Sequence, residues 1–240
     1  MDAVIVAAGA GTRMRPLTDD THKCLLPING RALVHYSLDT LFAQGIQRVY
    51  VVTGHCDQQL RAELGGRVHQ FILNPFYRLT NNMASLWFAR EHVQQDFIYL
   101  HADLLYHPDI LTKFLAHPFS FASICVEEKT EFLGEEMKVG REGDRLILGK
   151  NIPNEQAFGE FIGIAAFKKD KFQLFVDVMT DMLASGGHNS YFAEAIAIAS
   201  STRKVDVVTI SGLPWIEVDT PEDLERAREE TFSKILAFTG

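Results

Sequence analysis

A glycine-rich stretch near the amino terminus has residue types and spacing suited to binding phosphate. Residues 4–27 read VIVAAGAGTRMRPLTDDTHKCLLP, a short apolar run that continues into Gly9 and Gly11. Glycine lets the backbone approach a ligand and adopt positive φ without a Cβ penalty. Exposed backbone N–H groups, with Arg13 and Lys23 nearby, form a cradle for phosphate oxygens. The stretch therefore predicts a phosphate-binding loop at the carboxyl end of the first strand, where open α/β sheets bind their ligands.

The spacing excludes two better-known phosphate loops. A dinucleotide-binding fingerprint needs a third small residue at the position where this chain has Met14. It also needs an acidic residue after the second strand, and this chain has Thr53 there. The mononucleotide loop GxxxxGK[ST] does not occur in the chain. The predicted loop therefore belongs to another kind of phosphate site.

Two aspartates follow predicted strands and are candidates for a metal site. Asp103 follows the apolar run 97–100, and Asp219 follows the run 215–218. If both strands lie in one sheet and run the same way, both carboxylates reach the edge that carries the glycine loop. Such a pair suits Mg²⁺, which takes few protein oxygens and completes its shell with water and phosphate. Asp219 also fits a helix N-cap before Thr220-Pro221, and the two roles are compatible. His101 is a weaker ligand candidate.

The glycine-rich stretch resembles the signature of nucleotidyltransferases that join an NTP to a sugar phosphate or a similar acceptor. That signature is a strand, then G-x-G-T-R-x-x-P-L-T, a short spacer, and P-K-x-L-x-P. The positions that match in order are Gly9, Gly11, Thr12, Arg13, Pro16, Leu17, Thr18, Lys23, Leu25 and Pro27. His22 departs from the signature and stands where proline is usual.

The resemblance implies a transferase that uses Mg²⁺ as its cofactor. An acceptor phosphate oxygen would attack the α-phosphorus of the NTP in line, and pyrophosphate would leave. Arg13 and Lys23 are implied as catalytic residues, and Asp103 and Asp219 as metal ligands. The residues implied to bind the nucleotide are Ala7, Ala8, Gly9, Ala10, Gly11, Thr12, Arg13, Asn82, Ser85 and Asp103.

A second stretch, residues 74–86, resembles the N-x-x-Y-x-x-T-N-N-x-x-S-L segment of a narrower branch. This branch comprises the cytidylyltransferases that act on phosphocholine or aminoalkylphosphonates. Further similarity at residues 136–139, 159–164 and 215–224 extends over nearly the whole chain. The branch implies CTP as donor, with cytosine bound by the backbone of residues 7–9 and by Asn82 or Ser85. Either of these two side chains could instead cap a helix.

The acceptor site is predicted in the second half of the chain. The resemblance implies that Lys150, or less strongly Lys138, binds the acceptor phosphate, although either also fits an ordinary surface lysine. A phosphocholine or aminoethylphosphonate pocket must also hold a cation, which calls for carboxylates and aromatic faces. We expect Glu160 and Tyr191 to contribute to it, and further candidates are Glu136, Phe158, Glu194, Trp215 and Glu217.

Two other functions remain open from the sequence. One is a sugar-1-phosphate or inositol-phosphate nucleotidyltransferase that uses CTP, UTP, dTTP or GTP. The other is a nucleotide-binding regulator without turnover. The presence of Arg13, Lys23, Asp103 and Asp219 together argues against the regulator, which has no need of metal and leaving-group contacts.

Alternating strand and helix patterns predict an α/β fold with a doubly wound, mostly parallel central sheet of the Rossmann-like type. Strands are expected at residues 49–52, 68–73, 97–100 and 121–126, with helices near 33–42, 57–64 and 82–92. From about Glu127 the pattern changes to a hairpin at 137–148, a strand at 161–167 and helices near 170–184 and 190–199. No linker is visible. We therefore expect one domain, residues 1–240, with a nucleotide-binding half up to 126 and an acceptor-binding half from 127.

Composition limits the classes of partner. A net charge of −8 gives no support for a nucleic-acid surface and suits an enzyme with small-molecule substrates. Three cysteines without metal or redox spacing indicate reduced thiols, and hence a cytoplasmic protein. We expect neither a signal peptide nor a membrane span, because no apolar run approaches ~20 residues. A homodimer is compatible with the sequence.

Overall fold

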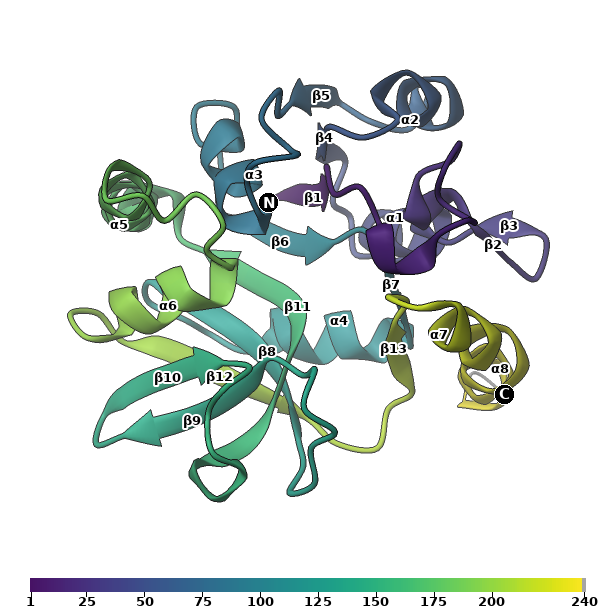
Figure 1. Cartoon of the computed structure of the whole chain (residues 1–240). Coiled ribbons are helices and arrows are strands. Elements are labelled where there is room, and N and C mark those ends of the chain that lie inside the picture. The colour runs from purple at the N-terminus through teal and green to yellow at the C-terminus, as the bar shows by residue number, and fades with distance from the viewer. Residues whose placement is uncertain (239–240) are drawn as a thin grey trace.

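The computed structural model describes residues 1–238 and has a nine-stranded mixed sheet at its centre (Figure 1). The first four strands of this sheet are parallel and lie in the order β5, β4, β1, β6. Their bounds are β1 Asp2–Ala7, β4 Arg48–Thr53, β5 Gln70–Leu73 and β6 Phe97–His101. Because β1 lies between β4 and β6, the loop that follows it leaves from the middle of the parallel strands.

A long antiparallel strand joins this parallel part to the rest of the sheet. β11 (Ala157–Phe167) pairs with β8 (Ala122–Glu128) on one side, and on the other with β6 near its end and with β9 (Lys138–Glu142) near its start. β12 (Val205–Ile210) runs parallel to β8, and β10 (Arg145–Gly149) forms a hairpin with β9. The predicted α/β class with a doubly wound central sheet is confirmed, and the antiparallel strands lie in the acceptor half.

Helices cover both faces of the sheet and make two separate cores. One core contains Val4 of β1 and the apolar faces of α3, α5 and α6, and the other contains Ala3 and Ile5 with α1, α2 and α4. The side chains of β1 alternate between the two cores because successive residues of a strand point to opposite faces. The bounds of these helices are α1 Val34–Ala43, α2 Asp57–Leu64, α3 Asn82–Ala89, α4 Pro108–Ala116, α5 Phe172–Ala184 and α6 Phe192–Ser200.

The strand that precedes Asp219 does not belong to the central sheet, so that part of the prediction is wrong. β13 (Trp215–Glu217) instead pairs antiparallel with β7 (Leu104–Tyr106) in a separate two-stranded sheet. β7 begins directly after Asp103, and the Val218 N–H donates to the Asp103 carbonyl at 2.9 Å. The two aspartates are therefore brought together by this small sheet and not by a shared edge of the large one.

The carboxyl-terminal helices pack beside the amino-terminal loop (Figure 1). α7 (Pro221–Arg226), a π-helical turn (Ala227–Thr231) and α8 (Phe232–Phe238) follow one another. Their apolar side chains share a third core with Met14 of the 3₁₀ turn Thr12–Met14 and with Ile28 of the short β2–β3 hairpin (Pro27–Ile28, Arg31–Ala32). Two further 3₁₀ turns are Asn154–Gln156 and Lys169–Lys171. Among the described residues, no helix combines the length and apolar content needed to cross a membrane.

Candidate active site

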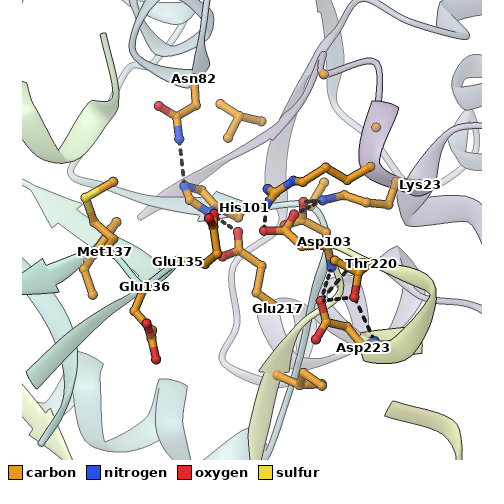
Figure 2. A pocket seen from close by; sticks show the side chains of 18 of the residues that line it. Lys23, Asn82, His101, Asp103, Glu135, Glu136, Met137, Glu217, Thr220 and Asp223 are labelled. Carbon is orange, nitrogen blue, oxygen red and sulfur yellow. Dashed lines mark hydrogen bonds and ion pairs between the residues drawn. The ribbon is translucent and has the colours of Figure 1, made fainter. Parts of the chain in front are cut away.

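A cleft of about 780 Å³ lies at the carboxyl ends of β1 and β6. Its walls come from the loop after β1, the start of α3, the β11 strand and the segment around β13 (Figure 2). This is the edge at which open α/β sheets bind ligands. Most of the sequence-predicted site residues line it: Ala7, Ala8, Gly9, Gly11, Thr12, Arg13, Lys23, Asn82, Ser85, Asp103, Lys150, Glu160, Tyr191 and Asp219. Ala10 and Lys138 are absent from this lining.

The two glycines of the loop, Gly9 and Gly11, are in different structural environments. Gly11 has φ 58°, and an added Cβ would lie 3.3 Å from Thr18 Cγ2 and 3.4 Å from Lys23 Cβ. The Thr18 hydroxyl donates to the Gly11 carbonyl at 2.7 Å and holds this turn. Gly9 is exposed and has no atom within 4 Å of an added Cβ, so its backbone faces open space in the cleft. The loop therefore leaves backbone groups accessible to a ligand.

His22, which departs from the signature, stabilises the turn that carries Lys23. Its Nδ1 accepts from the Cys24 N–H at 3.2 Å and caps the 3₁₀ turn Lys23–Leu25. The ring is buried, and burial lowers its pKa from 6.5 to about 4. A neutral, capping imidazole thus replaces proline, and Lys23 still points into the cleft.

Lys23 lies between two carboxylates at the centre of the cleft. Its Nζ is 2.6 Å from Asp103 Oδ2 and 2.5 Å from Asp219 Oδ1. Arg13 Nη2 contacts the other oxygen of Asp219 at 2.7 Å. Burial disfavours the ammonium, but Asp103 and then Asp219 outweigh it and raise the pKa of Lys23. Lys23 therefore stays charged, and the prediction that these four residues lie together agrees with the geometry.

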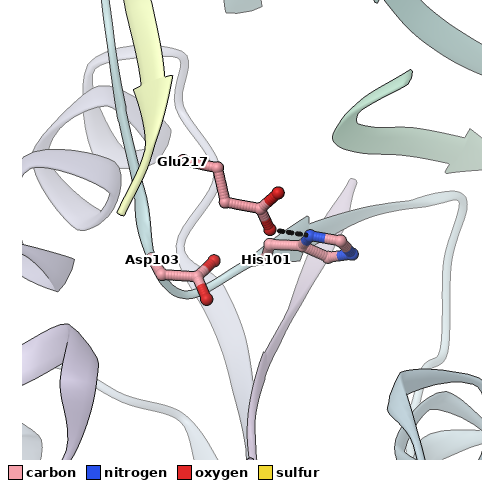
Figure 3. A group of neighbouring side chains, drawn as sticks. All are labelled: His101, Asp103 and Glu217. Carbon is pink, nitrogen blue, oxygen red and sulfur yellow. Dashed lines mark hydrogen bonds and ion pairs between the residues drawn. The ribbon is translucent and has the colours of Figure 1, made fainter. Parts of the chain in front are cut away.

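One oxygen of Asp103 is available for a metal ion. Asp103 Oδ1 is buried and, among the described residues, has no hydrogen-bond partner. Burial acts to raise the pKa of this carboxyl, but Lys23 and His101 act against it, and the net shift of the pKa is downward. Candidate ligand atoms of His101, Asp103 and Glu217 lie within 4.8 Å of one another (Figure 3). An ionised carboxylate with a free oxygen beside a second carboxylate suits a hard cation such as Mg²⁺.

Glu217 was predicted only as a partner for a cation of the acceptor, and the structure places it in this cluster. Its carboxylate accepts from His101 Nδ1 at 2.8 Å. Burial raises the pKa of the Glu217 carboxyl. Burial acts to lower the pKa of the His101 imidazole, but the neighbouring Glu217 carboxylate acts the other way, and the net shift of the His101 pKa is upward. The signal was present in the sequence, because Glu217 and Asp219 are two residues apart on an extended segment and so share one side.

Asp219 and Asn82, which the sequence allowed as helix caps, do not have that role. Thr220 caps α7, and its hydroxyl accepts from the Asp223 N–H at 3.2 Å. The carboxylate of Asp219 is thus left for Lys23 and Arg13. α3 is capped by Asn81, whose side-chain oxygen accepts from the Asn82 N–H at 2.8 Å.

Asn82 and Ser85, one turn apart on α3, both line the cleft. The Ser85 hydroxyl is hydrogen-bonded by Asn74 Nδ2 at 3.2 Å. Asn82 Oδ1 accepts from the Phe192 N–H at 2.7 Å, and Asn82 Nδ2 lies 3.2 Å from His101 Nε2. The Asn82 amide is therefore already engaged in the structure without a ligand.

The acceptor half contributes a carboxylate pair bridged by a lysine that the sequence analysis missed. Lys129 Nζ lies 2.6 Å from Glu160 Oε2 and 3.3 Å from Glu136 Oε1. Glu136 also accepts from the Leu133 and Gly134 N–H groups, and although burial opposes it, its pKa is lowered to about 2. Burial raises the pKa of Glu160 to about 7 despite Lys129.

The two predicted acceptor lysines lie in different environments. Lys150 lines the cleft, where its Nζ contacts Glu135 at 3.0 Å and lies 5.6 Å from the centre of the Tyr191 ring. Lys138 is buried, and its Nζ donates to the Ile152 carbonyl at 3.0 Å. Phe158 and Glu194 are also outside the cleft lining, and Glu194 instead accepts from the Tyr191 N–H at 2.8 Å.

The chain belongs to the MobA-like NTP transferase domain family, which it matches over residues 3–134, more than half its length. The predicted resemblance to a nucleotidyltransferase family is confirmed.

Two curated relatives are similar over most of the chain. A CMP-5'-(3-aminopropyl)phosphonate synthase from Streptomyces rubellomurinus is 28% identical over 94% of this chain, which spans only 38% of that relative. A choline-phosphate cytidylyltransferase from Streptococcus pneumoniae is 24% identical, with 95% of this chain and 97% of the relative covered.

The fold is also found in a solved structure. That of the inositol-1-phosphate CTP transferase from T. maritima superposes with a TM-score of 0.81 at 23% identity, covering 98% of this chain and 95% of that one. At this level of identity the likeness shows a common fold.

Proposed function

We propose that the chain transfers the cytidylyl group of CTP to a small phosphate or phosphonate acceptor that carries a cationic group. An acceptor oxygen forms a bond to the α-phosphorus while the bond from that phosphorus to the bridging oxygen breaks and pyrophosphate leaves. The attacking oxygen is already an anion, so no general base is needed. Catalysis then consists mainly of positioning and charge neutralisation.

The observation that carries this proposal is the placement of the Lys23 ammonium between Asp103 and Asp219, with Arg13 on the same carboxylate. Lys23 neutralises the α-phosphate and the attacking oxygen, and Arg13 holds the outer phosphates. Asp103, Asp219 and Glu217 are the carboxylates proposed to hold Mg²⁺, which when bound neutralises phosphate charge. The free Asp103 Oδ1 is the oxygen best placed for this role.

Two kinds of support favour CTP as the donor. The curated relatives similar over most of the chain carry names that specify cytidylyl products or activity. Ser85 and the backbone of residues 7–9 line the cleft and offer hydrogen-bond donors and acceptors. Such groups can distinguish the amino edge of cytosine from the carbonyl edge of uracil.

The acceptor side of the cleft favours a cation. Glu160 and Glu136 line it, and a single Lys129 lies between these two carboxylates. Tyr191 and Trp215 add aromatic faces to the lining, which attract an ammonium group. Lys150, whose Nζ lies 5.6 Å from the centre of the Tyr191 ring, is the residue proposed to bind the acceptor phosphate.

The test is a competition among acceptors in the presence of CTP and Mg²⁺, with pyrophosphate release as the measured signal. Phosphocholine, 2-aminoethylphosphonate, inositol 1-phosphate and glucose 1-phosphate are compared by kcat/KM. We expect a cationic acceptor to be preferred by at least about tenfold, as one well-placed charge contact gives. If inositol phosphate or glucose 1-phosphate has the highest kcat/KM, the cationic acceptor is refuted and the neutral-acceptor alternative stands.

A further inference from the structure

A chain of hydrogen bonds runs from the acceptor half to the carboxylate cluster, and Figure 2 shows its part from Asn82 through His101 to Glu217. It begins at the Phe192 N–H, at the start of α6, which donates to Asn82 Oδ1 at 2.7 Å. Asn82 Nδ2 lies 3.2 Å from His101 Nε2, and His101 Nδ1 lies 2.8 Å from Glu217 Oε1. The chain therefore links α6, α3, β6 and β13.

The direction of each bond follows from its first member. A backbone N–H can only donate, so the Asn82 atom that faces Phe192 is the carbonyl oxygen, and the amide nitrogen faces His101. An amide nitrogen cannot accept, so His101 Nε2 must be unprotonated and accept from it. The ring proton then lies on Nδ1, which donates to Glu217. Asn82 thus selects the tautomer of His101 that can hold Glu217.

The imidazole has little freedom to leave this position. Gly163 of β11 has φ 83°, and an added Cβ there would lie 2.7 Å from His101 Nδ1. Tyr99 and Phe161 contact the ring edge to face, with centroid distances of 5.5 and 6.1 Å. The ring plane is therefore set by packing as well as by hydrogen bonds.

We propose that Asn82 and His101 are positioning residues that hold the Glu217 carboxylate toward Asp103, so that both present oxygens to the divalent cation. The proposal rests on the proposed function, because that function supplies the cation. His101 is assigned no place as a ligand, since both of its nitrogens already have partners. Partners of this kind orient ligands, and their loss typically weakens metal binding about 10–100-fold.

The test measures Mn²⁺ binding to the full chain, without nucleotide, from the loss of the free-ion electron paramagnetic resonance signal. The variants are His101→Asn, whose amide nitrogen replaces Nδ1 as donor to Glu217, and His101→Gln, whose amide nitrogen replaces Nε2. We expect His101→Gln to weaken Mn²⁺ binding about tenfold and His101→Asn to keep it within about threefold of wild type. His92→Asn is the matched control, because His92 lies outside the cleft lining, and it should leave binding unchanged.

A second comparison tests whether Asn82 acts through His101. Asn82→Ala should weaken Mn²⁺ binding, and the double variant with His101→Gln should lose little more than His101→Gln alone, because residues that act as a unit are not additive. Thermal unfolding of each variant establishes that it is folded. If the losses of Mn²⁺ binding are additive, the proposed relay, in which Asn82 acts through His101 on Glu217, is overturned.

The remaining outcomes separate the relay from the proposed function. Wild-type Mn²⁺ binding in both His101 variants, with loss in Glu217→Gln, overturns the relay and leaves the metal site intact. An equal loss in His101→Asn, His101→Gln and Glu217→Gln makes His101 a ligand and overturns its positioning role. Unchanged binding in Glu217→Gln refutes Glu217 as a ligand, and the proposed metal site fails at that residue before the relay is considered.

Discussion

At the scale of single residues, the cations at the centre of the cleft form ion pairs with carboxylates of the same cleft. Lys23 and Arg13 share Asp219, and Lys23 also contacts Asp103. Under the proposed function, substrate phosphates take the place of Asp219 as the partner of these cations. Because Lys23 is largely buried, its charge acts in a medium of lower dielectric than water, where it is more effective.

Lys23→Ala should lower kcat by about 10²-fold or more, since one well-placed donor to developing charge contributes that much. The KM for CTP should change much less, because Arg13 and the loop backbone remain. Steady-state pyrophosphate release at saturating substrates measures both values. Lys113→Ala, an exposed lysine on α4, is the matched control. Near-normal turnover in Lys23→Ala would remove Lys23 from the mechanism.

The pKa of Glu160 predicts a pH dependence for the acceptor. Burial raises this pKa from 4.5 to about 7, so Glu160 gains its negative charge as the pH rises through 7. The other charged groups that face it are Lys129, Glu136 and Glu217, and of these Lys129 favours the ionised form. A cationic acceptor should therefore bind more tightly at pH 8 than at pH 6.

The measurement is the KM of the cationic acceptor between pH 6 and pH 8 at saturating CTP. We expect KM to fall by about 3–10-fold across this range in the wild type. Glu160→Gln should keep a high KM with a flatter profile, and what remains of the slope then belongs to the acceptor phosphate, whose second pKa is about 6. Parallel profiles in the two proteins would show that Glu160 does not bind the cation.

At the scale of elements, the loop between β8 and β9 links the two halves of the cleft. Glu135 of this loop contacts Lys150 at 3.0 Å and Arg13 at 3.7 Å, although its side chain is 82% exposed. In the free protein, Glu135 thus contacts cations that the proposed function assigns to the phosphates of both substrates. The proposed function therefore implies that substrate phosphates displace Glu135 from these cations.

Glu135→Gln should therefore lower the KM of the acceptor, because Lys150 loses its internal partner. The expected change is only about two- to threefold, since exposed ion pairs contribute little. The difference from wild type should shrink as salt is added. Glu131→Gln, in the same exposed loop but outside the cleft lining, is the control. A higher KM in Glu135→Gln would mean that Glu135 binds substrate and does not compete with it.

At this scale, the sequence predicted features formed by residues close together in the chain and missed contacts between segments far apart in it. The strand, glycine loop and Lys23 follow one another within 27 residues, so their order alone indicated a phosphate site. The pairing of β13 with β7, which sets Glu217 beside Leu104, joins segments far apart in the chain and has no local signal. From the sequence, His101 was only a weaker ligand candidate, because its partner Glu217 is 116 residues away in the chain. The α3 cap was missed by one residue, since neighbouring asparagines have the same capping chemistry.

At the scale of the whole molecule, β11 forms hydrogen-bonded strand pairs with both halves of the chain. β11 pairs with β6 of the nucleotide half, with β8, which lies mostly in that half, and with β9 of the acceptor half. Both large cores contain side chains from both halves: one includes Val4 and Phe192, and the other includes Ile5 and Ile164. A ligand bound to the nucleotide loop should therefore stabilise the acceptor half as well, which is the basis for proposing a single domain over residues 1–240.

The two tryptophans provide one fluorescent probe in each half. Trp87 lies on α3 in the nucleotide half, and Trp215 lies on β13 in the acceptor half. We expect the single-tryptophan variants Trp87→Phe and Trp215→Phe to show urea transitions in which probe and far-UV circular dichroism coincide. CTP at 100 times its Kd should raise the free energy of unfolding by about 2.7 kcal/mol as reported by either tryptophan. A Trp215 transition that separates from circular dichroism, or that does not respond to CTP, would show that the halves unfold independently and would refute the single domain.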